Sequence, residues 1–143
     1  MKKFNGLFPI RFDPKELEVN LGEGNFIFVG SGTDAWAFDI PPGWITRFLD
    51  YCNQFNNNYL FQSKDPSRFL EFMGHPVMQK SVLCTTIETN VFYPDIVRNA
   101  PNTRKRAQAM QKLANLGMRT CVTCEPLVKL DLPEMVEVIR MCY

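Results

Sequence analysis

Four short apolar runs, each followed by a stretch with the pattern of a helix, constrain the fold of this chain most. The runs lie at residues 25–31, 58–62, 81–87 and 119–124. Continuous apolar runs of this length are typical of strands buried on both faces, as in parallel sheets. Strands that alternate with helices at such spacing indicate right-handed βαβ crossovers. The sequence therefore predicts an α/β fold of about four parallel βα units.

The expected helices have recognisable starts and stops. Each follows a proline-containing turn or an N-cap residue, and the third is closed by Gly117. They are expected at about residues 42–55, 66–73, 103–116 and 131–141. Four βα units equal half of an eight-fold (β/α) barrel and could equally form a small open sheet. We expect residues 25–143 to form a partial (β/α) barrel, preceded by an extended, apolar N-terminal arm at residues 1–24.

Composition sets outer limits on function. A chain of 143 residues with 45% apolar residues can bury the core of one domain, which excludes disorder. The net charge of +1 gives no overall attraction to nucleic acid or to an anionic membrane. No run approaches the ~18 apolar residues that span a bilayer. The start Met-Lys-Lys is followed by no apolar signal segment, so we expect a cytoplasmic protein.

Two of the five cysteines are spaced like a metal or redox motif, in Cys121-Val122-Thr123-Cys124. The motif lies within a β-branched run, and positions i and i+3 of a strand point to opposite faces. A zinc or thioredoxin-type pair needs a turn or a helix start instead. The sequence therefore predicts buried structural thiols and no metal site.

Polar residues gather where the expected strands end. In parallel α/β folds, functional sites lie beyond the carboxyl ends of the strands, which meet along one rim. A mixed polar pocket is expected there, formed by Ser31, Asp34, Lys64, Thr86, Glu88 and Glu125. The alternative is that these are polar loop residues and helix caps, which every α/β domain needs.

Arg106 is the sharpest single candidate. It lies near the start of the expected third helix, one turn before Met110, on the flank of the buried face. Its guanidinium could reach a carboxylate or phosphate in a bidentate way at the strand ends. An internal ion pair with Glu88 or Glu125 is the equal alternative, while Arg104 and Lys105 are expected to point to solvent.

Several segments together resemble a known family. They are FIFVGSGTDAWAFDIPPGWI, NYLFQSKDPSRFLEF, TTIETN, and NAPNTRKRAQAM followed by Leu-x-x-x-Gly and a strand that ends in Glu-Pro-Leu. Their pattern and order are similar to radical S-adenosylmethionine enzymes, in the branch that includes spore-photoproduct-lyase-like and phage-encoded proteins. The resemblance covers roughly residues 26–128 and corresponds to the middle four βα units of that family.

The resemblance implies S-adenosylmethionine as a cofactor and assigns roles at the rim. Ser31 and Asp34 would lie where the family holds the amino group of the cofactor. Thr86 and Glu88 would face its ribose or carboxylate, and Arg106 its carboxylate. No catalytic residue and no metal ligand is expected in this chain.

The departure from the family is its defining Cys-x-x-x-Cys-x-x-Cys loop, which holds an iron–sulfur cluster. No such spacing occurs in this sequence, so radical chemistry by this chain alone is not expected. The chain would be a fragment, a shortened relative that binds a nucleotide or adenosine without catalysis, or a protein-interaction module. The expected partners are a second copy or a cluster-bearing segment, either of which would cover the open edges of the sheet.

Overall fold

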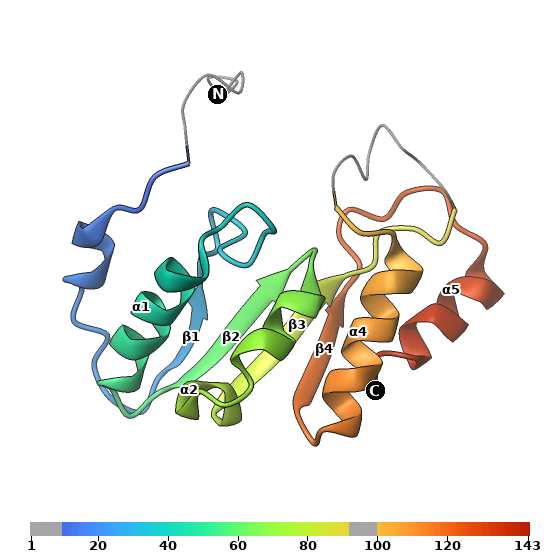
Figure 1. Ribbon diagram of the computed structural model, residues 1–143. Coiled ribbons are helices and arrows are strands. Elements are labelled where there is room, and N and C mark those ends of the chain that lie inside the picture. The colour runs from blue at the N-terminus through green and yellow to red at the C-terminus, as the bar shows by residue number, and fades with distance from the viewer. Residues whose placement is uncertain (1–9, 92–99) are drawn as a thin grey trace.

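The computed structural model describes residues 10–91 and 100–143 and confirms an α/β fold built on a parallel sheet. The strands are β1 (Phe26–Val29), β2 (Asn58–Ser63), β3 (Ser81–Thr86) and β4 (Arg119–Thr123). They lie side by side in the order β1-β2-β3-β4, and all three neighbouring pairs are parallel. The sheet is open, and its described strands do not close into a barrel (Figure 1).

The helices follow the strands as expected, and three of them lie over one face of the sheet. They are α1 (Pro42–Asn53), the short α2 (Pro76–Gln79), α4 (Thr103–Asn115) and α5 (Leu132–Arg140), with 3-10 turns η1 (Pro14–Leu17) and η2 (Pro66–Phe72). Figure 1 shows α1, α2 and α4 in front of the strands, over the same face of the sheet. No helix in the described ranges is long and apolar enough to cross a membrane.

The second crossover differs from the expected single helix. The segment expected at 66–73 is the 3-10 turn η2, and α2 follows it as a separate short helix. The Asp65 carboxylate accepts from the hydroxyl of Ser67 and not from a backbone N–H, so it is no helix cap. His75 caps α2 instead, because its Nδ1 accepts from the backbone N–H of Val77 at 3.3 Å.

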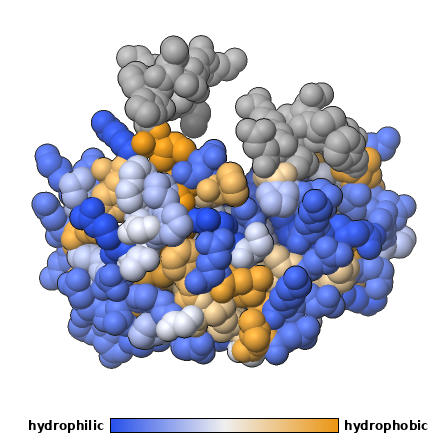
Figure 2. Space-filling view, viewed as in Figure 1, coloured by the Kyte–Doolittle hydropathy of each residue, from blue (hydrophilic) through white to orange (hydrophobic). Residues whose placement is uncertain are grey.

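The helix-covered face of the sheet carries the core. Side chains alternate between the faces of a strand, and Tyr59, Phe61 and Leu83 point to this face with no exposed surface. Trp36, in the loop after β1, packs edge-on against the rings of four phenylalanines, with centroid distances of 4.7–5.7 Å. From outside, this side of the molecule is mostly hydrophilic (Figure 2). The buried apolar side chains lie between the helices and the sheet.

The opposite face of the sheet is not covered by α1, α2 or α4, and we call it the helix-free face. Cys84 and Thr86 on this face are nevertheless buried. It carries every second residue of each strand, and register partners lie on the same side. Phe26 and Phe28 of β1 are 61% and 44% exposed there. Leu60 and Val82, next to them in the sheet, are half-buried.

The described part of the N-terminal arm packs on α1. The ring of Phe12 lies 5.6 Å from that of Trp44, and the Arg47 guanidinium stands 4.5 Å above the Phe12 ring. The hydroxyl of Tyr51 donates to the backbone carbonyl of Val19. The arm therefore contacts the outer side of a helix. Residues 1–9 of the expected arm lie outside the described residues.

Candidate functional site

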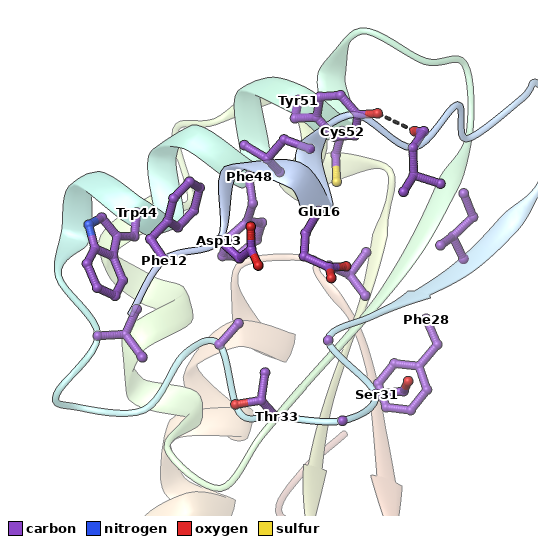
Figure 3. A pocket seen from close by; sticks show the side chains of 18 of the residues that line it. Phe12, Asp13, Glu16, Phe28, Ser31, Thr33, Trp44, Phe48, Tyr51 and Cys52 are labelled. Carbon is purple, nitrogen blue, oxygen red and sulfur yellow. Dashed lines mark hydrogen bonds between the residues drawn. The ribbon is translucent and has the colours of Figure 1, made fainter. Parts of the chain in front are cut away.

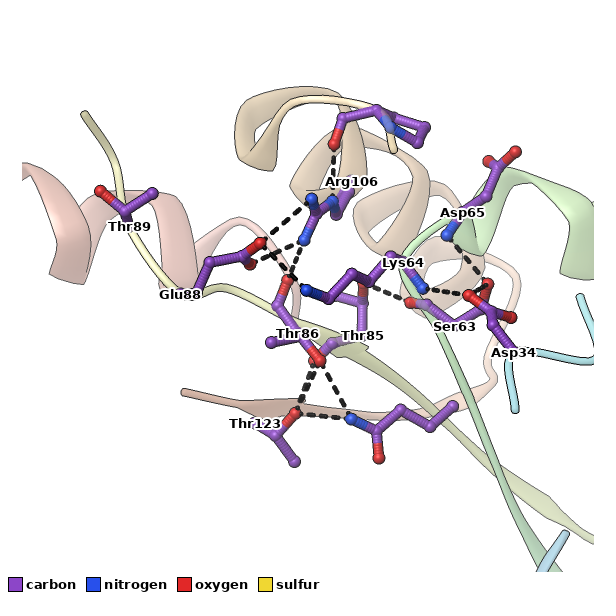
Figure 4. Close-up of polar contacts among 12 residues, drawn as sticks. Asp34, Ser63, Lys64, Asp65, Thr85, Thr86, Glu88, Thr89, Arg106 and Thr123 are labelled. Carbon is purple, nitrogen blue, oxygen red and sulfur yellow. Dashed lines mark hydrogen bonds and ion pairs between the residues drawn. The ribbon is translucent and has the colours of Figure 1, made fainter. Parts of the chain in front are cut away.

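The loop after β1 is fixed to the end of β2 by Asp34. Its Oδ1 accepts from the backbone N–H of Trp36 at 3.0 Å, which forms a local turn. Its Oδ2 accepts from the hydroxyl of Ser63 at 3.0 Å and from the backbone N–H of Lys64 at 2.9 Å. Asp34 lies at the rim as predicted, and its three bonds hold two strand ends together (Figure 4).

Glu88 and Arg106 form a fully buried ion pair at the same rim. Arg106 Nη1 lies 2.7 Å from Glu88 Oε2, and Arg106 Nη2 lies 3.3 Å from Glu88 Oε1. The guanidinium also donates to the backbone carbonyls of Thr86 at 2.8 Å and Pro101 at 2.6 Å. Of the two roles considered for Arg106, the structure shows the internal pair with Glu88. Glu125 is exposed, whereas both members of the pair have no exposed surface.

The start of α4 explains why the guanidinium reaches the strand. Asn102 caps the helix, its side chain accepting from the backbone N–H of Lys105 at 2.9 Å. Helical spacing then places Arg106 on the same face as Met110, toward the sheet. Arg104 and Lys105 lie on the outer side and are exposed, as expected.

Lys64 adds a second cation beside the pair. Its Nζ lies 3.4 Å from Glu88 Oε1, and its side chain is 42% exposed. Burial by itself raises the pKa of Glu88, but the hydrogen bond from Arg106 and the charges of Arg106 and Lys64 hold it below the ordinary value. One carboxylate thus faces two cations. Lys64 is the member of this group that presents charge to solvent.

Thr86 belongs to a second polar group, on the helix-free face. Gln62 Nε2 donates to Thr86 Oγ1 at 3.0 Å and to Thr123 Oγ1 at 2.9 Å. The two threonine hydroxyls lie 3.2 Å apart. These three residues come from neighbouring strands, β2, β3 and β4, close to their carboxyl ends (Figure 4). The amide oxygen of Gln62 makes no hydrogen bond to another described residue.

Ser31 lies apart from both groups. It is exposed in the turn after β1, where Thr33 N donates to Gly30 O at 3.0 Å. It lines a cavity of about 630 Å³ between the arm, α1 and β1, which Figure 3 shows from close by. Most of the lining is apolar or aromatic, including Phe28 and Trp44, and the carboxylates of Asp13 and Glu16 lie among these side chains.

The cysteines offer no cluster of metal ligands in the described parts of the chain. Cys121 lies on the helix-free face of β4, and Cys124 packs against the core on the other side. In the described ranges, no three histidine, cysteine or acidic side chains come close enough to hold a metal ion. All five cysteines are free thiols.

The predicted site residues therefore fall into three separate places. Asp34, Glu88 and Arg106 lie in the network on the helix side of the rim, Thr86 lies on the helix-free face, and Ser31 lines the cavity. Sequence reasoning missed Gln62, Thr123 and the cavity. Gln62 could have been found as a polar residue in an otherwise apolar strand run, but the cavity depends on how the arm packs.

Comparisons with known proteins give no relative. No family model matches the sequence, and neither a curated protein nor a solved structure matches it significantly.

Proposed function

We propose that this chain is the cofactor-side part of a partial (β/α) barrel of the radical S-adenosylmethionine type, unable to perform radical chemistry by itself. The observation that carries the proposal is the sequential order of four parallel strands, with helices over a single face. Successive strands of a (β/α) barrel follow each other in this way, with the helices outside. The helix-free face then corresponds to the barrel interior, which further strands would line.

The exposed aromatic rings on the helix-free face support this proposal on physical grounds. All-parallel sheets occur almost only where both faces are covered. Phe26 and Phe28, at 61% and 44% exposure, present two aromatic rings side by side along one strand of that face. Burying a phenylalanine side chain is worth roughly 1.5–3 kcal/mol. Completion of the barrel by further strands would supply that burial.

The outer edge of β1 also supports the proposal of an incomplete barrel. β1 pairs only with β2 among the described strands, so no described strand lies along its other edge. The cavity of about 630 Å³ lies along this strand, lined by Ile27, Phe28 and Val29 and closed by the arm. A preceding strand of a barrel would run in this place. The described part of the arm borders this cavity and packs on α1, and it does not pair with β1 as a strand.

The rim residues fit a small ligand in part. Glu88 and Arg106 hold each other and have no exposed surface, so they shape the rim, and their direct contact with a cofactor stays a prediction. Within residues 10–91 and 100–143, two groups keep capacity for a further hydrogen bond, the ammonium of Lys64 and the amide oxygen of Gln62. In this proposal, Lys64 binds the carboxylate of S-adenosylmethionine and Gln62 accepts from a hydroxyl or amino group.

An iron–sulfur cluster does not fit this chain. Its ligands are cysteine thiolates that converge on one point, whereas Cys121 and Cys124 lie on opposite sides of β4. The cluster supplies the electron for cleavage of the cofactor in the family that the sequence resembles. That supply would come from a further segment or a partner, and the residues of this chain would bind and orient the ligand.

Calorimetry with S-adenosylmethionine tests the binding part. We expect binding by the whole chain, weakened at least about tenfold in Lys64→Met, because a hydrogen bond to a charged group contributes roughly 1.5–3 kcal/mol. Lys80→Met is the matched control, since Lys80 precedes β3 at the other end of the sheet. Absence of heat up to millimolar cofactor would contradict this part of the proposal.

The radical part has a separate test in the genome. We expect a Cys-x-x-x-Cys-x-x-Cys segment in the coding sequence that surrounds or neighbours this one. A genomic neighbourhood without such a segment would contradict the radical part, while the calorimetric result would still stand for ligand binding.

A second candidate function is protein interaction, favoured by Phe26 and Phe28. In a dimer whose two-fold axis runs parallel to the strands, β4 of each copy would lie beside β1 of the other copy. The two sheets of four strands would then be joined at both edges. We expect a dimer by sedimentation, weakened in Phe28→Ser. Phe38→Ser is the control, because Phe38 is 79% exposed in a loop outside the sheet. A monomer at high protein concentration would contradict this candidate.

A further inference from the structure

Two thiols lie next to each other on the helix-free face, where β3 pairs with the edge strand β4. Cys84 of β3 and Cys121 of β4 are directly opposite each other in the strand register. Cys84 is fully buried, whereas Cys121 is half-buried and keeps a path to solvent. The Cys84 thiol donates to the backbone carbonyl of Thr85 at 3.7 Å, and the strand register alone sets the two cysteines side by side. The spacing of the cysteines along the chain gives no sign of this pair, because the residues are far apart in sequence.

The backbone geometry suits a bond between the two sulfurs. Neighbouring strands lie about 4.7–4.9 Å apart, and bonded cysteines usually have Cα atoms about 4.4–6.8 Å apart. Rotation of two side chains, without movement of either strand, would bring the sulfurs together. Both cysteines lie within regular strands, so the pair is held in register by the sheet.

The other cysteines are inert by comparison. Burial raises the pKa of Cys52 to about 12 and that of Cys142 to about 11, so neither forms a thiolate readily. The pKa of Cys124 is also raised by burial. The neighbouring Cys84 thiol lowers the pKa of Cys121, while the neighbouring Cys121 and burial raise the pKa of Cys84. Cys121 is therefore the nucleophile of the pair.

We propose that Cys121 and Cys84 form a reversible oxidation site for hydroperoxides, with Cys121 attacking and Cys84 resolving. The Cys121 thiolate attacks one peroxide oxygen, the O–O bond breaks, and the departing oxygen takes a proton and leaves as water or an alcohol. Cys121 is then a sulfenic acid. The Cys84 sulfur attacks the Cys121 sulfur, the S–O bond breaks, and the hydroxyl leaves as water with the Cys84 proton.

The two thiols together supply the two electrons that reduce the peroxide, and a dithiol reductant restores them. A partly exposed nucleophile of lowered pKa next to a resolving cysteine is the arrangement of redox-sensor sites. The inference does not rest on the proposed cofactor function, because both residues belong to the described sheet.

Peroxide titration of the whole reduced chain tests the site. With hydrogen peroxide near stoichiometry, we expect loss of two of the five free thiols. Peptide mapping should give one cross-link, Cys84–Cys121, that dithiothreitol removes. A first cross-link between other cysteines would overturn the proposal, as would oxidation of Cys121 to sulfinic acid with Cys84 unchanged.

Variants separate the two roles. Cys84→Ser should stop at a sulfenic acid on Cys121, trapped by dimedone, and Cys121→Ser should leave Cys84 reduced. Cys124→Ser is the matched control, since Cys124 directly follows β4 but lies on its other side, and it should behave as wild type. If Cys84→Ser does not fold, Cys121→Ser alone tests the proposal, because a substitution at the half-buried Cys121 should disturb the fold less. Oxidation of Cys84 in that variant at the wild-type rate would contradict the assignment.

Discussion

The two faces of the sheet come from the same four strands but differ in what covers them. On the helix-covered face, Phe61 and Leu83 have no exposed surface and pack under the helices. On the helix-free face, Phe28 is 44% exposed and Leu60 is half-buried. Stability should therefore come mainly from one face, while the other is available for a ligand, a partner or an oxidant.

Truncation of one aromatic residue on each face should show the largest difference. Phe61→Ala leaves a cavity in the core and should lower the free energy of unfolding by about 3–5 kcal/mol. Phe28→Ala should change it by about 1 kcal/mol or less, because that residue is already 44% exposed. Urea denaturation measures both. Similar losses in the two variants would show that the helix-free face is covered in solution.

The next largest effect is expected at the buried ion pair. Arg106→Met leaves the Glu88 carboxylate buried beside Lys64 alone, which should cost about 3–5 kcal/mol of unfolding free energy. Arg104→Met is the matched control, since Arg104 forms an exposed pair with Glu134 worth at most about 1 kcal/mol. The double variant Glu88→Leu with Arg106→Met should recover most of the loss. Equal effects of the two arginine substitutions would contradict a structural role for the pair.

A smaller, pH-dependent effect should follow from Glu88. Its pKa in the folded chain is below the ordinary value of 4.5, so the unfolded chain binds the proton more readily. The stabilisation is present above pH 4.5 and is lost as the pH falls toward the folded pKa. The free energy of unfolding should therefore decrease more between pH 7 and pH 4 in wild type than in Glu88→Gln. Parallel pH profiles would refute the assignment.

The smallest effect is expected for the polar group on the helix-free face. Gln62→Leu removes two hydrogen bonds, but the hydroxyls of Thr86 and Thr123 keep each other and can bind water. We expect a loss of about 1 kcal/mol or less. A loss as large as that of Arg106→Met would show that this group is buried under other chain segments in solution.

The alternation of strands and helices, and with it the parallel direction of the strands, was predictable because the apolar runs and the helix signals are local. Pro42 at the start of α1, Asn102 as a cap and Gly117 after α4, with its φ of 80°, act within a few residues. The 3-10 turn η2 was not predictable, because the buried Arg68 takes part in it by donating to the carbonyl of Ile40 across the fold.

The candidate site was predictable in its place but not in its partners. A parallel sheet brings the strand ends to one rim, so Asp34, Thr86, Glu88 and Arg106 were expected there. Which cation pairs with which carboxylate depends on differences of a few ångström in the distance between side chains of α4 and β3. From the sequence, Arg106 could bind a ligand or form an internal ion pair. Only the packing of α4 on the sheet shows that its guanidinium donates to Glu88 and to two backbone carbonyls.

The sequence by itself determined the class of the fold, the alternation of strands and helices and the end of the sheet where polar residues meet. The tertiary structure alone decided that the sheet is open, that the arm leaves a cavity beside β1 and that Cys84 lies opposite Cys121. The physical reason is the distance along the chain over which each kind of interaction acts. Propensity, capping and periodicity act over a few residues, whereas strand register and helix packing join residues that are tens of positions apart.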